Sequence, residues 1–204
     1  MSDTSKPNYI PLAPPEVEPL TLRAATPADA PALALVGAAT FLEAYTWMLP
    51  GPDILAFCAE HQTTAAYAKY LAQPTTRITL AQTGADVPVG FTMVVTPELS
   101  ADIVRPGDIE LKRIYLFSRF RSSSTPVLDA SGQPIPGLRG GQALLNAAIA
   151  DARSLSAKRL LLGTNAGNER AIAFYRRNGF VEVGTRTFIV GNQHCCDLIF
   201  ALTL

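Results

Sequence analysis

The alternation of apolar and polar side chains divides the chain into short strands and helices. Stretches in which every second side chain is apolar predict strands, and apolar positions three and four residues apart predict helices. The predicted strands cover residues 20–25, 76–82, 88–95, 109–117, 158–165, 180–190 and 194–204. The predicted helices cover a segment after Thr26, residues 51–62 and 63–73 as one or two helices, 141–156 and 168–179. This order is typical of an α/β domain with a mixed sheet.

Several boundaries carry specific signals. Thr26 suits an N-cap, Pro27 the first helical position and Asp29 the third, so the first helix has a well-defined start. Gly179 suits the end of the last helix. The strand 109–117 has low polarity on both faces toward its C-terminal end, which predicts a central, covered position in the sheet.

Composition narrows the classes of function. The length of 204 residues suits one domain, which we place at residues 19–204, after a Pro-rich N-terminal arm at residues 1–18. Seventeen basic residues balance seventeen acidic ones, which argues against a nucleic-acid partner or a polybasic membrane anchor. No apolar run reaches membrane-spanning length. The three cysteines do not form a plausible disulfide framework, so we expect a reducing, cytoplasmic setting.

Two adjacent glycines, Gly140 and Gly141, precede the predicted helix in the stretch PGLRGGQALLNAAIADA. A glycine turn that opens a helix can bind a phosphate, because free backbone N–H groups and the helix dipole both favour an anion. Taken alone, the stretch is compatible with a working anion site, a decayed one or a plain tight turn.

The most specific string is TNAGNERAIAFYRRNGF, which contains the spacing N-x-x-A-I-x-F-Y-x-x-x-G-F. Its members are Asn168, Ala171, Ile172, Phe174, Tyr175, Gly179 and Phe180. This string resembles the signature of GNAT N-acetyltransferases, and the element order extends the resemblance over about nine-tenths of the chain. The resemblance implies an α/β GNAT fold, a mixed and mostly antiparallel central sheet flanked by helices, with a splayed central strand. Residues 174–202 further resemble the polyamine (spermidine/spermine) branch.

The resemblance implies acetyl-CoA as co-substrate and no metal. It assigns the pantetheine arm to the strand edge Ile114, Tyr115 and Leu116 and to Asn168, with the Leu116 amide as oxyanion donor. It assigns the pyrophosphate to the turn formed by Leu138, Arg139, Gly140, Gly141 and Gln142. A strand edge with unpaired backbone groups can bind the pantetheine amides as an added strand would.

The turn departs from the family pattern Q/R-x-x-G-x-G/A. Pro136 stands at the first polar position and Arg139 at the first glycine, and an insert of about sixteen residues (121–136) precedes the turn. Arg139 either pairs with the phosphate directly or blocks the backbone approach that glycine permits. The insert is polar and predicted to be irregular.

For catalysis the resemblance implies Tyr175 as the acid that protonates the leaving thiolate and Glu110 as a base acting on the amine. Lys112 stands where many members of the polyamine branch have a second glutamate. Glu43, Tyr45 and Trp47 fall where the family's acceptor pocket is walled by the first helices, and a carboxylate beside aromatic rings suits a cationic amine. The run His194–Asp197 lacks the spacing of a zinc site.

Two further functions remain open beside acetyl transfer to a primary amine, for which a polyamine or another small amine is the expected acceptor. One is a GNAT-fold module that binds CoA and regulates or interacts, with weak or no catalysis. The other is an acetyltransferase acting on a protein N-terminus or lysine. A homodimer is an expectation from the family alone.

Overall fold

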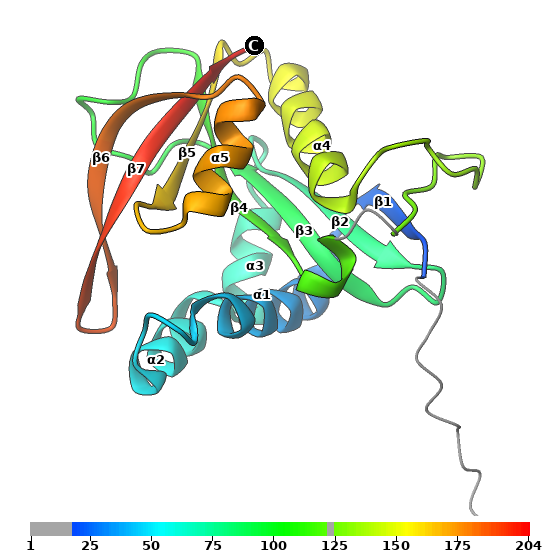
Figure 1. The fold of residues 1–204 in the computed structure, drawn as a ribbon, viewed down its shortest axis with the longest axis horizontal. Coiled ribbons are helices and arrows are strands. Elements are labelled where there is room, and N and C mark those ends of the chain that lie inside the picture. Colours follow the sequence, from blue (N-terminus) through cyan, green and yellow to red (C-terminus); the bar gives the residue numbers. More distant parts are fainter. Residues whose placement is uncertain (1–17, 122–124) are drawn as a thin grey trace, which may run out of the picture.

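The computed structural model describes residues 18–121 and 125–204, so the predicted N-terminal arm lies almost entirely outside the described residues. The strands are β1 (Leu20–Ala24), β2 (Arg77–Thr83), β3 (Pro88–Val95), β4 (Asp108–Leu116), β5 (Arg159–Asn165), β6 (Val181–Val190) and β7 (Gln193–Thr203). In the described part they form one seven-stranded sheet in the order β1-β2-β3-β4-β5-β7-β6 (Figure 1). Adjacent strands are antiparallel except β4 and β5, which are parallel. The mixed, mostly antiparallel sheet expected from the sequence is confirmed.

Helices cover both faces of the sheet. They are α1 (Ala30–Tyr45), α2 (Gly51–His61), α3 (Thr64–Leu71), α4 (Gly140–Ser154) and α5 (Glu169–Arg177). Helices α1 to α3 lie on one side and α4 and α5 on the other (Figure 1). The alternation along β3 matches these layers: Met93 packs with α1 and α3, whereas the next residue, Val94, packs with α4 and α5.

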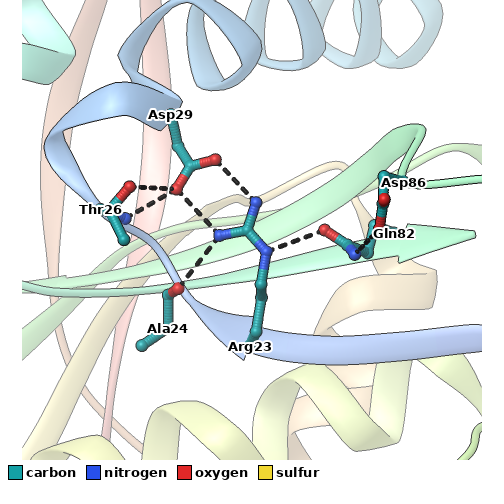
Figure 2. Close-up of polar contacts among 6 residues, drawn as sticks. All are labelled: Arg23, Ala24, Thr26, Asp29, Gln82 and Asp86. Carbon is teal, nitrogen blue, oxygen red and sulfur yellow. Dashed lines mark hydrogen bonds and ion pairs between the residues drawn. The ribbon is translucent and has the colours of Figure 1, made fainter.

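The start of the first helix follows the signals in the sequence. A 3-10 turn, Pro27–Asp29, leads into α1, and the Asp29 carboxylate accepts hydrogen bonds from the Thr26 backbone N–H at 2.7 Å and from its hydroxyl at 2.9 Å. The Arg23 guanidinium on β1 donates to both Asp29 oxygens, at 2.7 and 2.9 Å, and to Gln82 on β2 (Figure 2). This network fixes the corner between the first strand and the first helix.

The centre of the sheet is splayed, as the sequence predicted. Strands β4 and β5 pair only from Asp108 to Glu110, after which they separate. On the other side of β4 the register with β3 shifts by one residue at Lys112, which forms a β-bulge. The Phe117 N–H bonds to the Val89 carbonyl. Because antiparallel strands alternate their bonding direction, the backbone groups of Ile114 and Leu116 point away from β3, toward the gap.

The segment between β4 and α4 is more ordered than the sequence indicated. Its described part (residues 117–121 and 125–139) begins with a 3-10 turn, Ser118–Arg121, and then contains isolated bridges, yet it docks on the sheet edge. Leu20 donates its N–H to the Pro126 carbonyl, and Leu128 donates its N–H back to the Leu20 carbonyl, both at 2.8 Å. Val127 is buried against the core beside Leu20. An apolar residue inside the polar segment thus anchors the insert.

Candidate active site

A cavity of about 650 Å³ opens where β4 and β5 separate. Its walls come from the end of α1, the exposed length of β4, the start of α4, helix α5 and the β6–β7 hairpin. This volume is within the range typical of small-molecule sites. Of the residues predicted to form the site, the cavity is lined by Tyr45, Ile114, Tyr115, Leu116, Arg139, Gly141, Gln142, Asn168 and Tyr175.

The start of α4 presents free backbone donors to this cavity. Ala143 is the first residue to bond back into the helix, through the Arg139 carbonyl, so the N–H groups of Gly140, Gly141 and Gln142 have no helical acceptor. Among the described residues, no side chain caps this helix end. The helix dipole adds a partial positive charge at the same point. The geometry fits a phosphate group.

Arg139 does not disturb the backbone of the turn. Its φ of −102° and ψ of 151° lie in the extended region that any residue adopts, so this position does not require glycine. Within the described residues its guanidinium has no hydrogen bond or ion pair, and the residue lines the cavity. A free guanidinium beside free amides favours direct pairing with phosphate over obstruction of it.

The two glycines have different surroundings. A methyl group at Gly140 would lie 2.9 Å from the Phe120 carbonyl oxygen and from a Leu20 methyl, whereas a methyl at Gly141 would meet nothing within 4 Å. Gly140 is therefore needed for close packing of α4, and Gly141 is the open position at the cavity. Leu138 packs against the core beside Leu20 and, like Gly140, stands behind the cavity wall.

Further arginines near the turn were missed from the sequence. Arg121, from the insert, and Arg170 and Arg177, from α5, all line the cavity. Burial and the neighbouring Arg170 both lower the pKa of Arg121, although Glu43 opposes this. Arginines gathered without an equal number of acids favour an anionic ligand. Arg177 is the last residue of α5 and still belongs to this lining.

Helix α5 carries the family signature into the site. The Asn168 side chain caps the helix by accepting the Ala171 N–H at 3.1 Å, so its helix-capping and ligand-facing roles are compatible. Tyr175 is buried among Phe174, Phe180 and Phe200 while lining the cavity. Burial raises the pKa of the Tyr175 phenol, which keeps its hydroxyl group protonated.

The predicted acceptor residues are not brought together. Tyr45 lines the cavity with Phe41, at a ring-centroid distance of 4.5 Å. Glu43 instead accepts hydrogen bonds from the Ser118 backbone N–H and hydroxyl, and pairs with Arg121 at 3.7 Å. Trp47 is 68% exposed and donates its indole N–H to the Ala44 carbonyl. Glu43 and Trp47 lie near the end of α1 but are not part of the cavity lining.

Glu110 lies deeper than expected. It is 1% exposed and stands outside the cavity lining. One carboxylate oxygen accepts the Glu98 backbone N–H at 2.8 Å, and the other lies 3.8 Å from an Arg186 nitrogen. One oxygen is thus hydrogen-bonded and the other is in ion-pair contact with Arg186, and the base role of Glu110 stays a prediction. Lys112 lines the cavity and pairs with Glu98.

A second carboxylate, not selected from the sequence, does line the cavity. Asp197 on β7 accepts a hydrogen bond from Arg186 Nε on β6 at 3.2 Å. The Arg186 guanidinium lies across Gly163, where a methyl group would come within 2.8 Å of it. The sequence contained a signal for this pair, because a hairpin around the short turn GNQ places Arg186 opposite Asp197.

Comparison with known proteins identifies the family. The model of the acetyltransferase (GNAT) family matches residues 137–180. An uncharacterised N-acetyltransferase of Mycobacterium tuberculosis is 30% identical over 179 residues, which are 86% of this chain and 98% of that protein. The chain belongs to the GNAT family of N-acetyltransferases. The family match begins at the glycine turn and ends at the last residue of the α5 signature.

Solved GNAT structures share the fold at low identity. PaiA N-acetyltransferase from Thermoplasma acidophilum, crystallised with coenzyme A, superposes with a TM-score of 0.65 at 15% identity and covers 91% of this chain and 99% of its own. The spermidine/spermine N-acetyltransferase SpeG from Vibrio cholerae superposes with a TM-score of 0.57 at 16% identity and covers 90% of this chain and 93% of its own. At this identity the likeness concerns the fold, and the polyamine branch is one neighbour among several.

The described part contains neither a candidate membrane-spanning helix nor a candidate metal cluster. No described helix is both long and apolar enough to cross a bilayer. No three His, Cys, Asp or Glu side chains among residues 18–121 and 125–204 are grouped to hold a metal ion.

Proposed function

We propose that this protein transfers the acetyl group of acetyl-CoA directly to the nitrogen of a small primary amine in a ternary complex. The observation that carries this proposal is the single cavity wall formed by the start of α4, the unpaired edge of β4 and Tyr175. A pyrophosphate, a pantetheine arm and a thioester would meet these three features in that order.

The described residues fit acetyl-CoA as a substrate. The N–H groups of Gly141 and Gln142, which lack a helical acceptor, and Arg139, which has no partner within the described part of the chain, suit the pyrophosphate. The gap-facing backbone of Ile114 and Leu116 suits the pantetheine amides. The Leu116 carbonyl already accepts Arg121 Nε at 2.7 Å, so its N–H is the group left for the ligand or for the oxyanion.

The transfer needs one proton removed and one supplied. The neutral amine attacks the thioester carbon, a C–N bond forms and the C–S bond breaks. The leaving thiolate takes the hydroxyl proton of Tyr175, which is regained from the attacking nitrogen. The first proton passes from the ammonium group to a nearby base. The family resemblance implies Glu110 as this base, and Asp197 in the cavity lining is a second candidate.

Two measurements test this function. Calorimetric titration of acetyl-CoA into the wild-type protein should show binding, and an amine panel followed by free-thiol release should show turnover. Tyr175→Phe should lower kcat by about 10²-fold or more, while the Kd of acetyl-CoA changes by less than about threefold. Loss of binding in a folded Tyr175→Phe protein would show that the proposed proton-donor role is wrong.

The same titration separates the alternatives. A folded wild-type protein that gives no heat with high-micromolar acetyl-CoA would refute the enzyme and favour an interaction module. Binding of acetyl-CoA with thiol release only for peptide amines would favour a protein acetyltransferase. A polyamine acceptor, expected from residues 174–202, is tested in the same panel.

A further inference from the structure

The half of the cavity away from the glycine turn has an apolar wall. At the end of α1 the wall consists of Phe41, Tyr45, Met48 and Leu49, and the β6–β7 hairpin adds Phe188, Val190 and Cys195. Most of these side chains belong to one packed cluster that joins α1, α2 and the hairpin. Such a surface suits a ligand with an apolar or aromatic body.

The charged residues in the described cavity lining are mostly basic. Seven basic residues line it in the described part: Lys112, Arg113, Arg121, Arg139, Arg170, Arg177 and Arg186. Asp197 is the one acidic residue in that lining. Lys112, Arg113 and Arg186 lie on the strands at the base of the cavity rather than at the phosphate turn. Lys112 is paired with Glu98, and Arg186 with Asp197 and Glu110, but of these acids only Asp197 belongs to the described lining. A ligand with several ammonium groups would therefore find one carboxylate within reach there, and its other ammonium groups would lie among basic side chains.

Asp197 has one carboxylate oxygen available. Arg186 Nε bonds to Oδ2, and among the described residues no hydrogen bond reaches Oδ1. The residue is 5% exposed, so a ligand ammonium paired with Oδ1 would be largely shielded from water. Glu110 differs, since both of its oxygens have protein partners. Of the two carboxylates beside Arg186, Asp197 is the one that a ligand can reach.

Asp197 lines the same cavity as the proposed proton donor. That lining contains Tyr45, Tyr115, Tyr175 and Cys195 together with Asp197. Burial raises the pKa of the Tyr45 phenol, and the Asp197 charge adds to this increase. Tyr175 belongs to the wall at which the thioester is proposed to lie, and Tyr45 belongs to the apolar half. Asp197 therefore shares one cavity with the groups proposed to meet the thioester and the acceptor.

We propose that Asp197, oriented by Arg186, binds the acceptor ammonium and takes its proton, and that the acceptor is a monoamine with an apolar or aromatic body. This inference rests on the proposed acetyl transfer. The ammonium N–H bond breaks, its proton joins the Asp197 carboxylate, and the nitrogen lone pair then attacks the acetyl carbon. Asp197 returns the proton to solvent after product release, so each turnover releases one proton.

The pKa of Asp197 supports a base role. Burial raises it, and the Arg186 charge offsets part of the rise. A carboxylate with a raised pKa is a stronger base than an ordinary one. The charged or titratable groups facing it are Arg186 from β6, Tyr45 from α1 and Cys195 from β7, with Glu110 of β4 on the far side of Arg186.

The first test compares acceptors on the wild-type protein. Thiol release is measured with 2-phenylethylamine, spermidine and a short peptide with a free N-terminus, at saturating acetyl-CoA. We expect kcat/KM for 2-phenylethylamine to exceed that for either other amine by about tenfold or more. A higher value for spermidine or the peptide overturns this inference and leaves acetyl transfer standing. No acetyl-CoA binding, or no thiol release with any amine, overturns both.

The second test uses matched Asp→Asn variants. Asp197→Asn should lower kcat/KM for 2-phenylethylamine by about 10²-fold or more and abolish the fall of kcat/KM toward acid pH. Asp151→Asn is the control, because Asp151 is half-buried with a pKa raised by burial but bonds to Thr79 outside the cavity lining. It should keep wild-type kinetics. Thermal melts establish folding. If Asp197→Asn keeps the wild-type kcat/KM and its fall toward acid pH, and Glu110→Gln loses both, this inference is overturned and Glu110 is the base.

Discussion

Substitution of Gly140 and of Gly141 tests how closely the start of α4 packs against the residues beneath it. An added methyl at Gly140 would lie 2.9 Å from the Phe120 carbonyl oxygen, 2.9 Å from a Leu20 methyl and 3.0 Å from a Leu116 methyl. The leucine methyls can move, but the carbonyl is part of the backbone. Overpacking of this kind costs about 1–3 kcal/mol. The lower chain entropy of alanine returns about 0.4–1 kcal/mol.

Gly140→Ala should therefore lower the free energy of unfolding by about 1–2 kcal/mol, which for a domain of this size is a Tm lower by roughly 2–8 °C. Gly141→Ala is the matched control one residue along. A methyl there meets nothing within 4 Å. Only the entropy gain remains, so stability should rise by about 0.4–1 kcal/mol. Urea unfolding monitored by circular dichroism measures both. Equal midpoints for the two variants would refute the packing argument.

Three further predictions concern the site, the hairpin and the first corner. Arg139→Ala should weaken acetyl-CoA binding by about tenfold at low salt, because a charge-assisted bond to phosphate is lost, and calorimetric titration measures this change. Gly191→Ala should cost about 1–3 kcal/mol in urea unfolding, because φ is +55° and a methyl would lie 2.2 Å from the Asp53 carboxylate that holds the hairpin turn. Hydrogen bonding by Arg23 lowers the pKa of Asp29 in the folded protein. The stability that the ionised Asp29 contributes is therefore present above about pH 4 and is lost as the pH falls below this value. The stability gap between wild type and Asp29→Asn should shrink between pH 7 and pH 3 in urea titrations, and a constant gap would contradict the assignment.

The sequence predicted the elements well, because most boundaries depend on local signals. The corner at Thr26 is an example, since its cap, proline and carboxylate lie within four residues of one another. The signature around Tyr175 was equally informative, because helical spacing alone places Asn168 and Tyr175 on the side that faces the cavity.

The orientation of side chains was harder to predict where tertiary contacts decide it. Trp47 follows the end of α1, where the chain leaves the helical spacing, and its ring turns outward. Glu43 is drawn to Ser118 and Arg121, which are distant in sequence. Glu110 is enclosed because the loop after β3 brings the Glu98 N–H to it. None of these partners could be identified from the spacing of residues.

The docked insert has a consequence for how the sheet meets other chains. An exposed edge strand has unpaired N–H and C=O groups that can pair with a strand of another chain, and this pairing promotes aggregation. Here residues 126–128 occupy the Leu20 end of β1 and satisfy its backbone groups from within the same molecule. Shortening the segment to the usual family length would uncover that edge together with the apolar surface beneath Val127. The insert thus protects the edge strand from pairing with other chains. A variant that lacks the insert should first show a loss of solubility.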